Sequence, residues 1–283
     1  MPLSRLIAMD RRAELADYLR ARRAAVQPGD VGLPSSPRRR TKGLRREEVA
    51  MLAGVSVTWY TWLEQGRRIN ASREVLESLG RALCLDAAGR DHLLTLAALG
   101  PAPLSPSAAD LDPPDALVDL LDSLTPAPAY ILGPRWEFVA WNRPQALLYP
   151  AIEQLEAEDR NLAWVVYARS DTRALIVDWE AEARLLLAEL RSDLGQLGHD
   201  ETAAKLVTRL RAASVQFDTW WNEHDVARFR TRLRRYRHPR AGELVFQYQV
   251  LTPAEWPHLR VAVQLPVPGD DSAQRLSAWH DVV

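Results

Sequence analysis

The chain has 283 residues, of which 47% are hydrophobic and 26% are charged, and this balance excludes a disordered or fibrous protein. The net charge of −1 hides an asymmetry: the first 100 residues hold 17 Lys and Arg against 11 Asp and Glu, and the remaining residues hold 19 against 26. A basic first third favours a polyanionic partner, and the length suffices for two domains with separate cores.

The chain has a single cysteine, Cys84, which excludes an internal disulfide and a cysteine metal cluster. Cys84 lies in an apolar stretch, so we expect it to be buried. The start of the chain lacks the apolar core of a signal peptide, and no run of about 18 apolar residues follows. We therefore expect a cytoplasmic protein that does not span a membrane.

The first domain is expected to be all helical and to cover residues 1–100. Ser56 and Ser72 precede apolar periodic segments and are predicted helix N-caps, and Gly66 is a predicted helix end. The spacing of apolar residues predicts helices over residues 11–26, 44–53, 56–65, 72–83 and 87–99. Residues 101–114 are rich in proline and serine and are predicted to form a linker.

The second domain is expected to cover residues 115–283 and to mix helices with strands. Helices are predicted over residues 115–124, 142–148, 179–194 and 201–213. Strands are predicted over residues 129–132, 137–141, 244–251 and 259–265.

Residues 44–68 have the pattern of a helix-turn-helix, in which two short helices meet through a tight turn. Ala50 is small where the second helix would cross, and Gly54 permits a left-handed turn residue. Val55 would fill the space between the helices, and Tyr60 and Leu63 would place the inner face of the second helix on the core.

This segment resembles the lambda-repressor-like, xenobiotic-response-element group of helix-turn-helix domains. The resemblance rests on Glu48-Val49-Ala50, Ala53-Gly54-Val55-Ser56 and Leu63-Glu64-Gln65-Gly66-Arg67. It implies a double-stranded DNA operator as the partner.

The second helix of such a motif lies in the major groove with its N-terminal residues at the base edges. Thr58 would then hydrogen-bond a base and Val57 would pack on a thymine methyl group. Trp59 and Trp62 lie beside them and either face DNA or pack against a neighbouring element. Glu64 is expected to orient nearby arginines.

Basic residues around the motif are expected to contact phosphates. A run before the first helix would add diffuse attraction or act as a minor-groove arm. The predicted DNA-binding residues are Arg38, Arg39, Arg40, Lys42, Arg45, Arg46, Ser56, Val57, Thr58, Trp59, Trp62, Arg67 and Arg68.

The second domain shows no catalytic constellation and no histidine pair at metal-ligand spacing, so we expect neither an enzyme nor a resident metal or cofactor. Its most prominent feature is a set of aromatic residues. Such a set either lines an apolar cavity or fills an ordinary core.

Four segments of the second domain resemble the ligand-binding domain of MmyB-like regulators. They are Val139-Ala-Trp-Asn142, Arg160-Asn-Leu-Ala with Asp178-Trp-Glu180, the stretch from Phe217 to Val226, and His238-Pro-Arg-Ala-Gly-Glu-Leu244. The resemblance implies a PAS-like domain, in which a small antiparallel sheet flanked by helices binds a fatty-acid-like ligand.

The pocket of such a domain would lie between the sheet and the helices, and His224, Arg228 or His238 would meet a lipid carboxylate. The predicted ligand-binding residues are Trp136, Phe138, Trp141, Asn142, Phe217, Trp220, Trp221, His224, Phe246 and Tyr248.

The sequence thus predicts a two-domain α+β protein, a nucleoid-associated bacterial regulator that binds DNA and a small apolar ligand. A homodimer is expected, because dimers read half-sites about 34 Å apart. An alternative remains open, in which the second domain serves only dimerisation or a protein partner. An enzyme fused to a DNA-binding domain is a third hypothesis.

Overall fold

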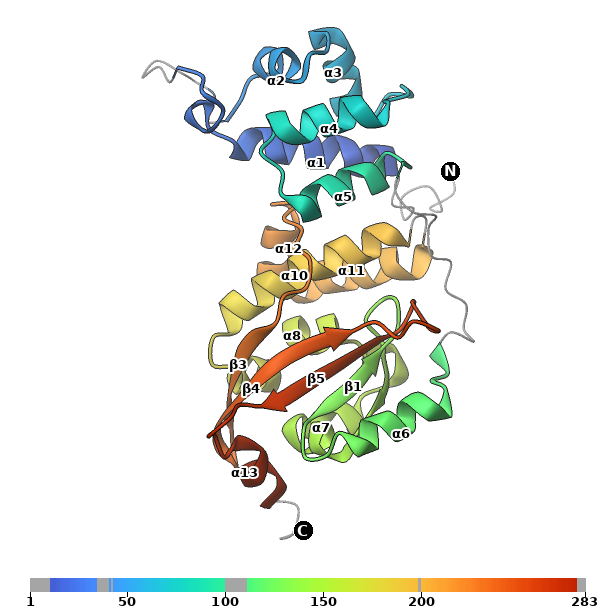
Figure 1. Ribbon diagram of the computed structural model, residues 1–283, viewed down its shortest axis with the longest axis vertical. Coiled ribbons are helices and arrows are strands. Elements are labelled where there is room, and N and C mark those ends of the chain that lie inside the picture. Colours follow the sequence, from blue (N-terminus) through green and yellow to red (C-terminus); the bar gives the residue numbers. More distant parts are fainter. Residues whose placement is uncertain (1–10, 35–40, 42, 100–110, 198–199, 279–283) are drawn as a thin grey trace. The chain divides into compact units, whose positions relative to one another are not determined.

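The computed structural model describes residues 11–34, 41, 43–99, 111–197 and 200–278 (Figure 1). Contacts divide the chain into two compact units. Unit 1 comprises residues 1–104, 191–208 and 218–228, and unit 2 comprises residues 105–190, 209–217 and 229–283. The predicted fold class is confirmed: a helical helix-turn-helix region precedes a small antiparallel sheet with helices.

The N-terminal part of unit 1 consists of short helices around one apolar core. They are α1 (Arg11–Ala25), η2 (Pro28–Val31), α2 (Arg46–Ala53), α3 (Val57–Glu64), α4 (Arg73–Ala82) and α5 (Ala87–Leu96). Tyr18 and Leu19 from α1, Tyr60 from α3 and Leu76 and Leu79 from α4 are fully buried in this core. The predicted helices are confirmed, with ends that differ by up to three residues.

The predicted caps are confirmed as well. The Ser56 hydroxyl accepts a hydrogen bond from the Trp59 amide at 3.1 Å, and that of Ser72 accepts one from Val75 at 3.3 Å. These bonds satisfy amides that lack a partner within the helix. Gly54 and Gly66 have φ angles of 70° and 68°, so both turns use the left-handed conformation that glycine adopts without strain.

Cys84 is exposed, so the expectation that it is buried was wrong. Its φ of 52° is left-handed and follows the end of α4, where the chain reverses. Leu83 and Leu85 on either side fill the core instead.

A buried histidine forms part of the interior of unit 1. His92 on α5 is 3% exposed, and its ring meets that of Tyr18 edge-on at 5.0 Å. Neither ring nitrogen has a hydrogen-bond partner among the described residues. A Cβ on Gly195 would lie 2.9 Å from the ring, so a glycine is needed where α10 passes His92.

Unit 2 contains a five-stranded antiparallel sheet in the order β2-β1-β5-β4-β3. The strands are β1 (Ala129–Leu132), β2 (Phe138–Trp141), β3 (Arg232–His238), β4 (Gly242–Leu251) and β5 (Arg260–Pro266). Four were predicted, and β3 was missed. Its inward positions are Arg234, Tyr236 and His238, so the strand lacks the apolar alternation that marks a half-buried strand.

The remaining helices follow from residue 115 onward. They are α6 (Asp115–Ser123), α7 (Arg143–Leu148), η4 (Pro150–Gln154), η5 (Ala157–Asp159), α8 (Leu162–Ala168), α9 (Ser170–Leu175), α10 (Trp179–Gln196), α11 (Glu201–Ala213), α12 (Val215–Trp221) and α13 (Ser272–Ala278). The division into units passes through α10, α11 and α12. Across the described residues, no helix has both the length and the apolarity needed to cross a bilayer.

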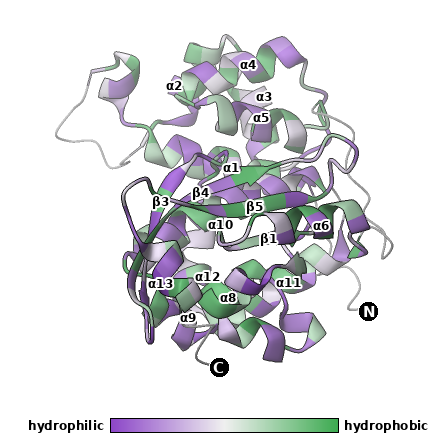
Figure 2. Cartoon of the chain, turned by 60° about the horizontal axis from the view of Figure 1, so that its bottom comes forward, coloured by the Kyte–Doolittle hydropathy of each residue, from purple (hydrophilic) through white to green (hydrophobic). Residues whose placement is uncertain are grey.

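One apolar cluster joins α6 to the sheet. Leu117 and Leu121 from α6 pack with Ile131 from β1 and with Val261 and Val263 from β5. Figure 2 shows the apolar residues of β5 and α8 in green. The packing of α6 covers apolar side chains of β1 and β5, and their removal from water stabilises this part of the fold.

The environment of His92 makes the stability of the protein dependent on pH. Burial, followed by the charges of Arg191 and His224, lowers the pKa of His92 to about 3. In the unfolded chain His92 is protonated below about pH 6.5, whereas in the folded chain it stays neutral down to about pH 3. We therefore expect the unfolding free energy to fall as the pH drops through this window, by up to about 1.4 kcal/mol per pH unit from this residue. In urea titrations, His92→Leu should show a shallower pH dependence, and an unchanged slope would contradict the prediction.

Candidate nucleic-acid interface and ligand site

Helices α2 and α3 form the helix-turn-helix, with the corner at Gly54. The amide of Val55 donates to the carbonyl of Ala50 at 2.9 Å and closes the turn. Tyr60 and Leu63 are buried, as predicted. The opposite face of α3 is exposed: Val57 and Trp62 are each 39% exposed, and Thr58 is exposed between them. This is the geometry in which a helix presents one face to the major groove.

A buried carboxylate holds the motif to the rest of unit 1. The side chain of Glu64, at the end of α3, is fully shielded from solvent. Arg23 on α1 donates to its two oxygens at 2.5 and 3.2 Å, and Arg46 on α2 donates from Nε to Oε2 at 2.6 Å. We call these three residues the Glu64 bridge.

The electrostatics of the Glu64 bridge favour the ionised acid. Burial raises the pKa of Glu64, but hydrogen bonds from Arg23 and Arg46 outweigh it, so the pKa is lowered below its usual value. Arg23 also donates to the carbonyl of Leu44 at 2.9 Å, which ties the segment before α2 to α1. The bridge therefore fixes α1, α2 and α3 to one another.

Arg46 has a second, outward face. Its side chain is 43% exposed although its Nε is held by Glu64. It begins α2, where the amides that lack helical partners attract anions. A guanidinium fixed at one edge and open at the other is suited to a phosphate contact.

The other predicted DNA-binding residues are placed as follows. Ser56 caps α3, and Trp59 is half-buried against the core of unit 1. Arg45, Arg67 and Arg68 are exposed, and the Arg67 guanidinium lies 5.6 Å from the Trp62 ring centroid. The predicted residues Arg38, Arg39, Arg40 and Lys42 lie outside the described residues.

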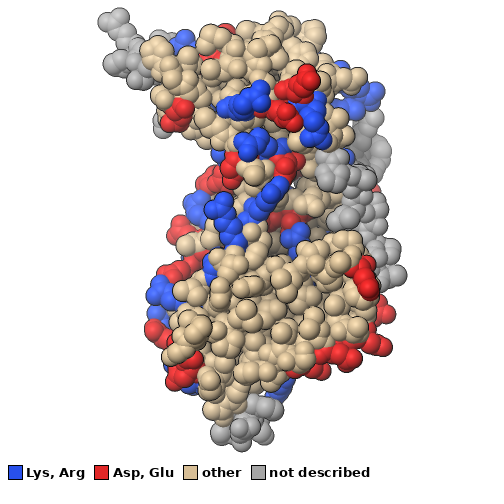
Figure 3. Space-filling view, viewed as in Figure 1, with Lys and Arg blue, Asp and Glu red and all other residues tan. Residues whose placement is uncertain are grey.

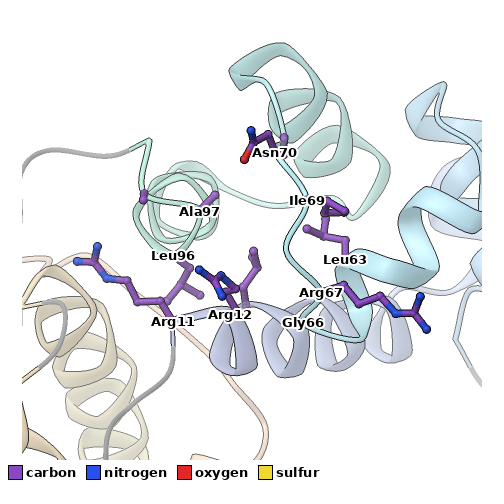
Figure 4. Close-up of a pocket in the computed structure, with 12 residues that line it drawn as sticks. Arg11, Arg12, Leu63, Gly66, Arg67, Ile69, Asn70, Leu96 and Ala97 are labelled. Carbon is purple, nitrogen blue, oxygen red and sulfur yellow. The ribbon is translucent and has the colours of Figure 1, made fainter.

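A hollow of about 330 Å³ lies behind the C-terminal end of α3 (Figure 4). Arg11 and Arg12 from α1 and Gly66 and Arg67 from the following loop contribute to its lining. The guanidinium groups of Arg11 and Arg67 point in opposite directions (Figure 4), so the arginines do not converge on one anion.

The predicted ligand-binding residues do not all belong to one unit. Trp220, Trp221 and His224 fall in unit 1, and the other seven fall in unit 2. Within unit 2, Phe138 meets Tyr130 edge-on at 5.2 Å, and the hydroxyls of Tyr130 and Tyr248 lie 3.0 Å apart. Phe246 packs near Tyr236, and Phe217 packs against Tyr167. The buried Trp136 and the half-buried Trp141 are also in unit 2.

Asn142 has a structural role in this fold. Its side-chain oxygen accepts from the amides of Ala129 and Gln145, and its nitrogen donates to the carbonyls of Leu121 and Ala127, all at 2.9 to 3.1 Å. All four hydrogen bonds that an asparagine side chain ordinarily makes are thus used within the chain.

The interior of unit 2 contains a polar network that was not predicted from the sequence. Arg234 on β3 lies against the ring of Tyr248, 3.3 Å from its centroid, and donates to Glu182 on α10 at 2.5 Å. Arg232 donates to Glu182 and to Glu189. Burial raises the pKa of Glu182, but the two arginines outweigh it and the pKa is lowered. The alternation of Arg232, Arg234 and Tyr236 was the only available signal.

The structure also places an apolar cavity of about 230 Å³ in unit 2. None of the ten predicted ligand-binding residues lines it. It is lined by Leu148, Tyr149, Pro150, Ala151, Asp171, Thr172, Leu175, His238 and Pro239. His238 is already satisfied: its Nε2 faces the carbonyl of Leu147 at 3.0 Å and its Nδ1 accepts from the Ala241 amide at 3.0 Å. Burial lowers the pKa of His238, and the ring fixes the turn after β3.

A substitution tests the Glu64 bridge without reference to DNA. Glu64→Gln removes the charge that Arg23 and Arg46 share. Because both arginines still reach solvent, we expect a loss of about 1.5–3 kcal/mol of unfolding free energy, the size of a hydrogen bond to a charged group. The control is Glu77→Gln, whose exposed pair with Arg73 at 3.9 Å should contribute under about 0.5 kcal/mol. Equal losses in urea denaturation would show that Glu64 has no special role.

Comparison with known protein families gives two matches. Residues 14–93 match a model described as a helix-turn-helix domain, and residues 113–278 match one described as the MmyB-like transcription regulator ligand binding domain. A search of curated proteins finds no match. Within the described residues, no group of three or more His, Cys, Asp or Glu side chains is placed to hold a metal ion.

The second match covers more than half of the chain, and the first coincides with the helices that the Glu64 bridge holds together. The chain belongs to the MmyB-like helix-turn-helix transcription regulators, with a DNA-binding domain followed by a ligand-binding domain.

Proposed function

We propose that the chain binds a specific operator through α3 and that a small apolar, fatty-acid-like ligand modulates this binding. The observation that carries the DNA-binding part is the Glu64 bridge, which holds Arg46 half-exposed at the start of α2 and ties it to α3, whose residues Val57 and Trp62 are exposed. Residues 1–100 would act as the DNA-binding domain, residues 101–114 as the linker and residues 115–283 as the sensor.

The apolar cavity of unit 2 supports the choice of ligand. Its walls include Leu148, Pro150, Ala151 and Leu175, and the hydrogen bonds of His238 are used within the chain. An apolar ligand gains free energy by leaving water for such a site. The ten ligand-binding residues predicted from the sequence do not line this cavity. Their role in ligand binding is a separate proposal.

A dimer is part of the proposal, because one helix-turn-helix covers little DNA. Leu233 on β3 and Leu251 on β4 are 62% and 56% exposed, and the face of unit 2 turned to the viewer in Figure 3 is largely uncharged. Exposed apolar residues of this kind favour association. They equally favour the alternative, in which the second domain only dimerises or binds a protein partner.

Two substitutions test the DNA contacts. On a short pseudo-palindromic operator near the chain's own gene, Arg46→Ala should weaken binding to all sequences alike and lower the salt slope by about one. Thr58→Ala should instead relax the preference at one base position. If both variants bind like the wild type, the placement of α3 in the groove is wrong.

Mass spectrometry of the purified protein tests the ligand. We expect a co-purifying lipid, or saturable binding of added fatty acid that shifts the operator affinity. Leu175→Trp should fill the cavity and reduce lipid binding. The control is Leu185→Gln, at a leucine of α10 that is 45% exposed and lies outside the cavity lining, and it should leave lipid binding unchanged. Lipid-free protein whose operator affinity ignores fatty acids would favour the dimerisation alternative.

A further inference from the structure

The largest fully buried side chain in the described residues is a cation, Arg191 on α10, at 1% exposure. Its guanidinium lies 3.8 Å from the ring centroid of Trp221 and donates to the carbonyl of the same residue. A terminal nitrogen lies 3.4 Å from Nδ1 of His224. All three residues belong to unit 1.

The charge of Arg191 is directed at α1. Its Nη1 lies 3.7 Å from Oε1 of Glu14, whose side chain is 11% exposed. Burial raises the pKa of Glu14 above its usual value, and the charge of Arg191 is the largest influence that opposes this shift. A buried carboxylate needs such a partner, so Arg191 holds the first turn of α1.

The other end of α1 is bonded to α3. Arg23 lies nine residues after Glu14 on the same helix, about 14 Å along its axis, and it donates to Glu64. Glu64 in turn holds Arg46. A chain of contacts inside unit 1 therefore runs from Arg191 through α1 to the Glu64 bridge.

We propose that Arg191 is a positioning residue for DNA binding. By anchoring Glu14 it fixes α1 along its axis, and α1 fixes the Glu64 bridge that presents Arg46 and α3. This inference rests on the proposed DNA contacts of Arg46 and α3. It adds that the geometry of Arg46 and α3 is set by a residue outside the helix-turn-helix match, which covers residues 14–93.

The test uses the full chain with Arg191→Met, Glu14→Gln and the double variant. The double variant removes the carboxylate that Arg191→Met would leave buried without its cation, so it should recover thermal stability. Arg184→Met is the control, because Arg184 lies on the same helix in unit 2 and its ion pair with Glu180, at 3.8 Å, is exposed, with the two side chains 44% and 72% accessible.

Operator affinity and its salt slope are measured at a temperature where circular dichroism shows each variant folded. Arg191→Met and the double variant should bind about tenfold more weakly, with a salt slope lower by about one, as for Arg46→Ala. Arg184→Met should bind like the wild type. If the folded double variant keeps wild-type affinity and slope, Arg191 stabilises the fold without positioning the interface.

Amide hydrogen exchange of α3 separates this proposal from the proposed function. Arg191→Met and the double variant should both exchange faster across Val57–Glu64 than the wild type and Arg184→Met. If the variants exchange faster but the wild type binds no operator, the DNA-binding proposal fails, while the proposal that Arg191 fixes α1 and α3 is supported. Unchanged exchange in the folded double variant would overturn the anchor.

Discussion

The burial of one carboxylate governs the DNA-binding part of this chain. Glu64 is shielded from water, and an ionised acid in such a place is tolerated only with cations and hydrogen bonds around it. Arg23 and Arg46 supply both, and because they come from different helices, the demand for neutralisation becomes a constraint on geometry. The exposed face of α3 and the outward edge of Arg46 are consequences of where Glu64 is placed.

Unit 2 also contains buried carboxylates that are neutralised by arginines, and there the network has more members. Glu182 and Glu189 from α10 face Arg232 and Arg234 from β3, and Tyr248 and Tyr130 continue the polar contacts into the sheet. Such a network restricts the packing, because each polar group can form its hydrogen bonds in only a few orientations. It contrasts with the apolar cluster under α6, where shape alone decides the packing.

The helix-turn-helix could be predicted from the sequence because its signals are local. Ser56 caps a helix that starts at the next residue, and Gly54 and Gly66 take the left-handed angles that end the helices around them. The ion pairs could not be predicted from the sequence, because their members are far apart in the chain: Arg23 and Glu64 are separated by 41 residues, and Arg234 and Glu182 by 52. Strand β3 was missed for the same reason, because its inward side chains find their partners in distant segments: Arg234 at Glu182, Tyr236 at Gln264 and His238 at Leu147. The apolar cavity likewise depends on three segments that meet only in the folded chain.

The division of the chain into units has a consequence for how such a regulator can be taken apart. Residues 191–208 and 218–228 fall within the ligand-binding match, yet they pack as part of unit 1. A fragment cut at residue 104 would keep the whole helix-turn-helix match but lose the cation beside Glu14 and the glycine beside His92. The helix-turn-helix region therefore shares its interior with residues 191–208 and 218–228, and a fusion to another sensor would have to carry these residues or replace their contacts.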